Sequence, residues 1–179
     1  MTIKTVTSLE YIHKKGHFGN YQKQNVKNLL QISEVKNLTI IQLVQYKKSK
    51  IQTSTIKVED LDLPLESLKV TANKETRVLW NAPRTWLIIS NKKNIINNIK
   101  DKCDHSNFAV TDISHSRAVI QIKGLQAKEV LKKGCPININ EIQVNNCAGT
   151  VFNGITVVVD FVNNNPDTFN LLALRSFSE

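Results

Sequence analysis

The residues in this chain that are most able to do chemistry are Asp112, Ser114 and His115, which stand within four positions of one another. Together a serine, a histidine and an aspartate can form a nucleophilic triad. The spacing argues against one, because successive side chains at the start of a strand point in alternating directions. A triad needs side chains that converge from separate elements. We therefore expect His115 to be structural, as a hydrogen-bond partner of the backbone where a strand begins.

Other candidates are arginines and tryptophans. Arginine binds carboxylates and phosphates, and tryptophan can stack on a planar ligand, but both types are also common at protein interfaces and tryptophan is common in cores. No catalytic, cofactor-binding or metal-binding role is predicted for any of them. The candidate interface or structural residues are Trp80, Trp86, Arg84, Asp112, His115, Arg117 and Arg175.

Familiar cofactor motifs are missing from the sequence. The six glycines are dispersed, so neither a dinucleotide-binding glycine motif nor a phosphate-binding loop is present. The three cysteines, Cys103, Cys135 and Cys147, form no Cys-x-x-Cys pair. We expect them to be reduced thiols in a reducing compartment.

The charge and length of the chain limit its class. It has 179 residues, enough for one domain with a core, and a net charge of +9. That charge suggests an anionic partner such as nucleic acid, which steep salt dependence would reveal. However, the lysines are dispersed and aromatic residues make up only 6% of the chain, too few for a base-stacking platform. There is neither a long apolar run for a membrane span nor a signal-peptide core at the N-terminus, so we expect a cytoplasmic protein with no membrane or nucleic-acid partner.

The first half of the chain contains the elements that precede Asp112. Residues 1–34 are polar and basic and predict an N-terminal arm, with a short helix near Val26–Leu30. Strands are predicted at 38–46, 77–82 and 86–90, while 47–60 is ambiguous and 61–65 is a turn region. A helix is predicted over 91–102 with Asn91 as its cap.

The second half repeats this order of elements. A strand over 108–123 carries Asp112 to His115 near its start and leads into a helix over 125–133. A loop follows, and Asn153-Gly154 then joins strands at 150–152 and 155–162, because Asn-Gly between apolar runs is a strong hairpin signal. The last strand is predicted over 168–177. We expect one α+β domain over 35–179, with a mixed or antiparallel sheet, split β-α-β units and helices on one face.

A series of short motifs resembles a known family. The Asp-x-Ser-His and Gly-x-x-Ala pieces are similar to the folate-binding domain of the glycine-cleavage T-protein, and the full set resembles the gamma subunit of heterotetrameric sarcosine oxidase. In chain order, the pieces are Leu63-Pro64, Leu79-Trp80 with Trp86-Leu87, Asp112-Ile-Ser-His-Ser116, Gly124-x-x-Ala127 with Leu131-x-x-Gly-Cys-Pro136, Cys147-Ala-x-Thr150 and Arg175-Ser-Phe177.

The resemblance implies a fold like the T-protein folate-binding domain and a non-catalytic small subunit. Its partners would be the alpha, beta and delta subunits of an enzyme that oxidatively demethylates sarcosine to glycine and passes the one-carbon unit to tetrahydrofolate. FAD, FMN, NAD, zinc and tetrahydrofolate would belong to those other subunits. The alternative is a stand-alone folate-binding or one-carbon transfer protein related to aminomethyltransferase. Family members usually continue past Arg-Ser-Phe into an amphipathic helix, whereas this sequence stops at Glu179.

Overall fold

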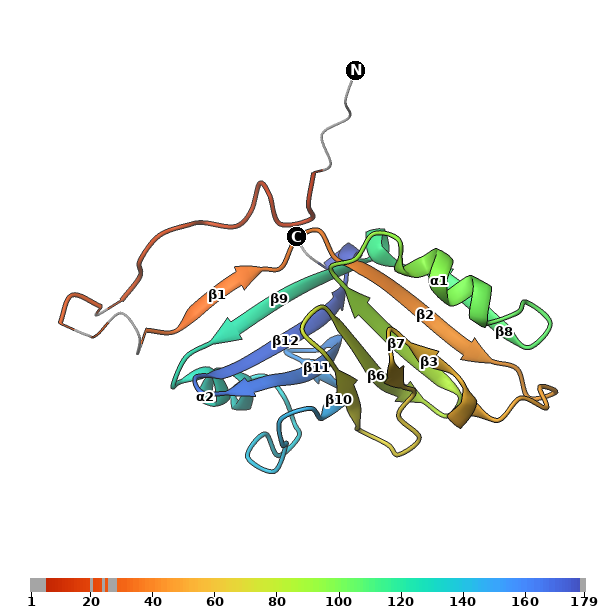
Figure 1. Ribbon diagram of the computed structural model, residues 1–179. Coiled ribbons are helices and arrows are strands. Elements are labelled where there is room, and N and C mark those ends of the chain that lie inside the picture. Colours follow the sequence, from red (N-terminus) through yellow and green to blue (C-terminus); the bar gives the residue numbers. More distant parts are fainter. Residues whose placement is uncertain (1–5, 20, 24, 26–28, 178–179) are drawn as a thin grey trace, which may run out of the picture.

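The computed structural model describes residues 6–19, 21–23, 25 and 29–177 of the chain. Its strands form two five-stranded sheets, each with one helix beside it, and a small two-stranded sheet (Figure 1). Each pair of neighbouring strands in these sheets is antiparallel. The predicted α+β class is confirmed, because two short helices accompany antiparallel sheets.

The first sheet, here called the α1 sheet, has the strand order β5-β6-β7-β2-β8. Its strands are β5 (Val70–Ala72), β6 (Thr76–Ala82), β7 (Thr85–Ser90), β2 (Thr39–Gln45) and β8 (Phe108–Asp112), and its helix is α1 (Ile95–Lys102). The unit β7-α1-β8 is a split β-α-β unit, because β2 lies between its two strands and runs antiparallel to both. In the small sheet, β3 (Lys57–Val58) falls in the part of the sequence that was ambiguous, whereas β4 (Leu61–Asp62) lies where a turn region was predicted.

The second sheet, here called the α2 sheet, has the strand order β1-β9-β12-β11-β10. Its strands are β1 (Gln31–Glu34), β9 (Arg117–Lys123), β12 (Asp167–Leu174), β11 (Ile155–Asn164) and β10 (Cys147–Phe152), and its helix is α2 (Ala127–Lys132). The predicted hairpin joins β10 to β11. Its turn residues Asn153 and Gly154 both have positive φ, at 48° and 86°, as a tight hairpin turn requires.

Alternating side chains on the strands give each sheet two apolar faces. On the α1 sheet, Trp86 faces the helix and packs in one cluster with Ile99. On the α2 sheet, Phe169 packs with Leu131 of α2 in a second cluster. Burying each such side chain stabilises the fold by roughly 1.5–3 kcal/mol.

The opposite faces of the two sheets share a third cluster. Leu79 and Leu87 of the α1 sheet pack there with Val119 and Leu172 of the α2 sheet. The sheets therefore meet through their inner faces, and each helix covers the outer face of its own sheet. The sequence analysis expected a single sheet with helices on one face, because a period of two indicates which side chains share a face but not which sheet a strand joins.

Several boundaries differ from the sequence prediction. The strand expected over 108–123 is two strands in different sheets, β8 and β9, separated by a 3₁₀ turn at Ser114–Ser116. Helix α1 begins at Ile95 and not at 91, because the backbone N–H groups of Asn91 and Lys92 bond to Glu75 and Ser90 outside any helix. Gln31–Glu34, assigned to the arm, pairs with β9 as an edge strand.

The leading segment, meaning the described residues between 6 and 30, runs alongside the α2 sheet (Figure 1). The helix predicted near Val26–Leu30 lies mostly outside the described residues. No helix in the described part of the chain is long and apolar enough to cross a membrane.

Candidate functional site

The crossover between the two sheets contains the residues that the sequence analysis put first. Asp112 is the last residue of β8, the turn Ser114–Ser116 follows, and Arg117 begins β9. Because β8 belongs to the α1 sheet and β9 to the α2 sheet, these residues lie where the chain passes from one sheet to the other. The position of these residues is therefore set by the connection between β8 and β9.

Hydrogen bonds from Ser114 shape this crossover. Its hydroxyl donates to Oδ1 of Asp112 at 2.6 Å, and its backbone N–H donates to the same oxygen at 2.9 Å. The Ser114 hydroxyl also accepts the N–H of Ile40 on β2 at 2.9 Å. These two bonds from Ser114 hold the pKa of Asp112 below its ordinary value, because they stabilise the carboxylate.

The backbone hydrogen bond expected of His115 is not found among the described residues. Its side chain is exposed and makes no hydrogen bond to any residue that the structure describes, whereas Ser114 bonds the neighbouring strand. A 3₁₀ turn replaces the expected continuous strand, so that Ser114 faces β2 and its neighbour faces solvent. The arrangement also excludes a Ser-His-Asp triad here, since the serine donates its proton to the aspartate and not to the histidine.

A cleft of about 350 Å³ opens beside the crossover. Four of the seven candidate residues, Asp112, His115, Arg117 and Arg175, line it together with the start of the leading segment. Arg117 is partly buried and forms no ion pair with any described residue, and burial lowers the pKa of its guanidinium. Arg175 donates to the backbone carbonyl of Val6 at 3.2 Å. The cleft is thus a mainly basic depression between the sheets.

The other three candidates lie elsewhere. Trp86 is buried in the core, and its Nε1 donates to the carbonyl of Pro64 at 2.8 Å. Trp80 pairs with it across β6 and β7 and is only partly buried. Arg84 lies in the turn between these strands with φ at 59°, and it donates to the carbonyl of Tyr46. The structure brings none of these three into the cleft.

One pair of functional groups was missed by the sequence analysis. Arg77 on β6 binds Asp160 on β11 through two hydrogen bonds of 2.7 Å, and the Asp160 side chain is completely buried. Burial raises the pKa of Asp160, while the guanidinium opposes that rise. The only signal in the sequence is one acidic residue inside the apolar run 155–162. The pair joins the two sheets and leaves neither group available for chemistry.

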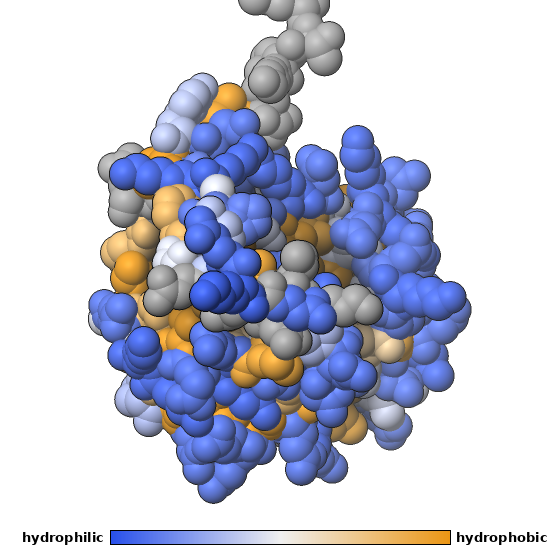
Figure 2. All heavy atoms as spheres, turned by 90° about the vertical axis from the view of Figure 1, so that its left-hand side faces the viewer, coloured by the Kyte–Doolittle hydropathy of each residue, from blue (hydrophilic) through white to orange (hydrophobic). Residues whose placement is uncertain are grey.

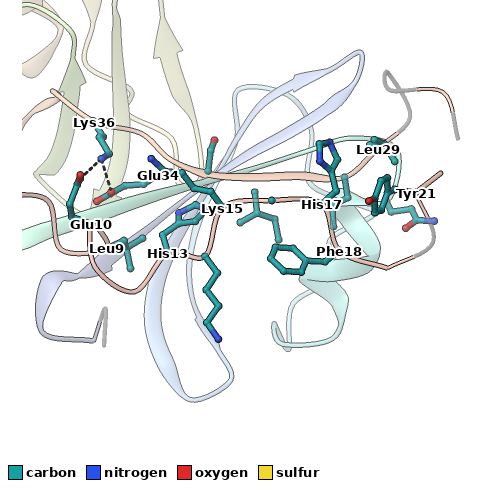
Figure 3. A pocket seen from close by; sticks show the side chains of 16 residues that line it. Leu9, Glu10, His13, Lys15, His17, Phe18, Tyr21, Leu29, Glu34 and Lys36 are labelled. Carbon is teal, nitrogen blue, oxygen red and sulfur yellow. Dashed lines mark hydrogen bonds and ion pairs between the residues drawn. The ribbon is translucent and has the colours of Figure 1, made fainter.

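A second depression of about 840 Å³ lies between the leading segment and β1 (Figure 3). Its lining combines apolar side chains with lysines and histidines. Among the residues that the structure describes, no three His, Cys, Asp or Glu side chains gather in a way that could hold a metal ion. The basic cleft and this partly apolar groove are thus two open depressions on the described surface.

Solved structures share this fold. A chain of heterotetrameric sarcosine oxidase from Corynebacterium sp. U-96, in complex with pyrrole 2-carboxylate, matches with a TM-score of 0.74 and 23% identity over 85% of this chain and 79% of that one. Aminomethyltransferase T of the glycine cleavage system from Bartonella henselae matches with a TM-score of 0.61 and 11% identity, over 84% of this chain and 43% of that one. The fold is thus shared with a sarcosine oxidase chain and with part of an aminomethyltransferase.

The particular family follows from the sequence match. The model of the sarcosine oxidase gamma subunit family matches residues 50–179. The chain belongs to this family, and the predicted membership is confirmed. No curated protein sequence matches the chain.

Proposed function

We propose that this chain is the non-catalytic gamma subunit of a heterotetrameric sarcosine oxidase. The assembly would demethylate sarcosine oxidatively to glycine and transfer the one-carbon unit to tetrahydrofolate. The observation that carries the proposal is the family match over residues 50–179. The likeness to a chain of the Corynebacterium enzyme supports it at the level of the fold.

The interactions of the described residues support a structural role for this chain rather than a catalytic one. The Ser114 hydroxyl donates a hydrogen bond to Asp112, and the Arg77 guanidinium donates to Asp160, so these groups serve the structure. We assign FAD, FMN, NAD, zinc and tetrahydrofolate to the alpha, beta and delta subunits. This chain would hold the assembly together.

We further propose that the exposed candidates contact those subunits. Arginine and tryptophan are enriched at protein interfaces. Arg117 is a suitable contact, because a partly buried guanidinium without an ion pair among the described residues gains from an acidic partner group. We also propose a cytoplasmic location, which the three free, buried cysteines support.

Co-expression with the alpha, beta and delta subunits tests the proposal. We expect this chain to purify with them in one complex, and we expect sarcosine-dependent oxygen consumption by that complex. The isolated chain should be colourless and inactive. A flavin spectrum that follows the pure chain, or full assembly and activity when this chain is left out, would overturn the proposal.

The alternative is a stand-alone folate-binding or one-carbon transfer protein, and the fold shared with aminomethyltransferase T favours it. Calorimetric titration of the isolated chain with tetrahydrofolate distinguishes the two proposed functions. Saturable binding by the chain alone would favour the alternative. We expect no such binding, because this chain shares the fold of aminomethyltransferase T but only 11% of its aligned residues.

A further inference from the structure

The leading segment is fastened to the body of the molecule at one end. Thr7 donates its hydroxyl proton to Glu34 of β1 at 2.7 Å, and Glu10 forms an ion pair with Lys36. Arg175 bonds the carbonyl of Val6. These contacts hold residues 6–10 beside β1, and in Figure 3 the Lys36–Glu10 contact marks this end of the groove.

Beyond this fastening, the segment and β1 enclose the depression of about 840 Å³, here called the leading-segment groove. Its apolar lining consists of Leu9, Phe18, Tyr21, Leu29, Leu30 and Ile32. Phe18 is 71% exposed and Ile32 is 51% exposed, although both side chains belong to types that are usually buried. The groove therefore presents apolar surface to solvent.

Exposed apolar residues gather at this end of the molecule. Half of the twelve large apolar side chains that the described structure exposes lie on the leading segment, on β1 or in the turn before α2. They are Tyr11, Ile12, Phe18, Tyr21, Ile32 and Leu125. Figure 2 shows this side, where apolar patches lie among hydrophilic side chains. Exposed apolar patches among polar side chains often mark an interaction site.

Basic residues lie among the apolar residues of the groove. Lys14, Lys15, His13 and His17 contribute to its lining. The two lysines form no ion pair with any described residue, whereas the acidic groups of the lining, Glu10 and Glu34, both lie within ion-pair distance of Lys36. With three lysines, Lys14, Lys15 and Lys36, against Glu10 and Glu34, the lining keeps an excess of one positive charge, which favours an acidic partner.

On the basis of the proposed function, we propose that the leading-segment groove receives a segment of a partner subunit of the oxidase that presents large apolar side chains next to carboxylates. The apolar lining takes the apolar side chains, and the lysines pair with the carboxylates. The volume is too large for one side chain and suits several residues of a peptide. Phe18 and Tyr21 are the anchors, because aromatic residues dominate the energetics of interfaces.

The groove also lies outside the part of the chain that defines the family. The family match begins at residue 50, whereas the groove is built mainly from residues 9–36. The proposed docking site is thus built mainly from residues that precede the part of the chain matched by the family.

The test uses the complex co-purified with the alpha, beta and delta subunits. Phe18→Ala combined with Tyr21→Ala should weaken capture of this chain by the other subunits about tenfold or more. The matched control is Tyr46→Ala combined with Leu65→Ala, whose side chains are also exposed but lie outside the groove. The control should assemble as the unsubstituted chain does, and the thermal midpoint of the isolated chain should be unchanged in both variants.

A charge variant tests the contribution of the lysines separately. Lys14→Glu combined with Lys15→Glu should weaken capture, and the loss should shrink as salt rises toward about half-molar, where screening is strong. Equal capture of the groove variants and the unsubstituted chain would overturn the inference while leaving the proposed function intact. Equal weakening by the control would also overturn it. Failure of the unsubstituted chain to assemble would instead overturn the proposed function.

Discussion

The body of the molecule and its leading segment use similar side chains in opposite ways. In the body, Phe169 is fully buried and stacks on Phe161 with the ring centroids 4.2 Å apart. In the leading segment, Phe18 and Tyr11 lie mostly in solvent. Folding of this chain alone therefore buries the large aromatic side chains in the core of the body, whereas it leaves Phe18 and Tyr11 of the segment in solvent. The difference indicates which part of the chain makes the fold and which part is available for assembly.

Alanine substitutions of two phenylalanines test this contrast directly. Phe169→Ala should lower the free energy of unfolding by about 3–5 kcal/mol, because it leaves a cavity in the α2 sheet cluster. Phe18→Ala should change it by less than about 0.5 kcal/mol, since its side chain is exposed. Urea unfolding of the isolated chain gives both values. Similar losses in the two variants would show that the segment belongs to the folded core.

Breaking the ion pair between the sheets should destabilise the chain almost as much as Phe169→Ala. Asp160→Ala should cost about 3–5 kcal/mol, because it leaves the Arg77 guanidinium without its buried partner. The double variant Arg77→Ala with Asp160→Ala should cost less than the sum of the two single variants, since the two groups interact. Urea unfolding of all three variants completes the cycle. Strict additivity would contradict the contact.

The crossover between the sheets should respond less strongly. Ser114→Ala should cost about 1–3 kcal/mol, because the Ile40 N–H loses its acceptor at the sheet junction. His115→Ala, one residue away, should change the free energy of unfolding by less than about 0.5 kcal/mol, because its side chain is exposed. Both variants are compared by thermal and urea unfolding. The assignment of the structural bond to Ser114 fails if the histidine variant is the less stable of the two.

The smallest effect concerns the three cysteines of the body, all of which are free and buried. Burial raises the pKa of Cys103 to about 11 and that of Cys147 to about 12, so their reactive thiolate is scarce near neutral pH. We expect a thiol reagent at pH 8 to leave the folded chain nearly unmodified and to label all three cysteines in urea. Fast labelling of any one of them in the folded chain would contradict this burial.

Local signals in the sequence predicted most of the elements. The strand at Thr39–Gln45, the pair of strands around the Pro83-Arg84 turn and the Asn153-Gly154 hairpin all follow from alternation and turn chemistry, which depend on neighbouring residues. The ordered short motifs predicted the family for the same reason, because they are read along the chain. Element boundaries near Ile95 and Ser114 were less accurate, since backbone bonds to distant strands decide them.

The sequence by itself thus determined the class of fold, most strands and both helices, and the family. Only the tertiary structure decided how the strands divide between two sheets, because alternation specifies a face and not a pairing partner. It alone showed that Arg77 meets Asp160, 83 positions away, and that Ser114 and not His115 fastens the crossover. It alone formed the leading-segment groove, whose walls come from the segment, β1 and the residue before α2. Contacts between residues far apart in the chain leave no local pattern, so they are decided when the chain packs.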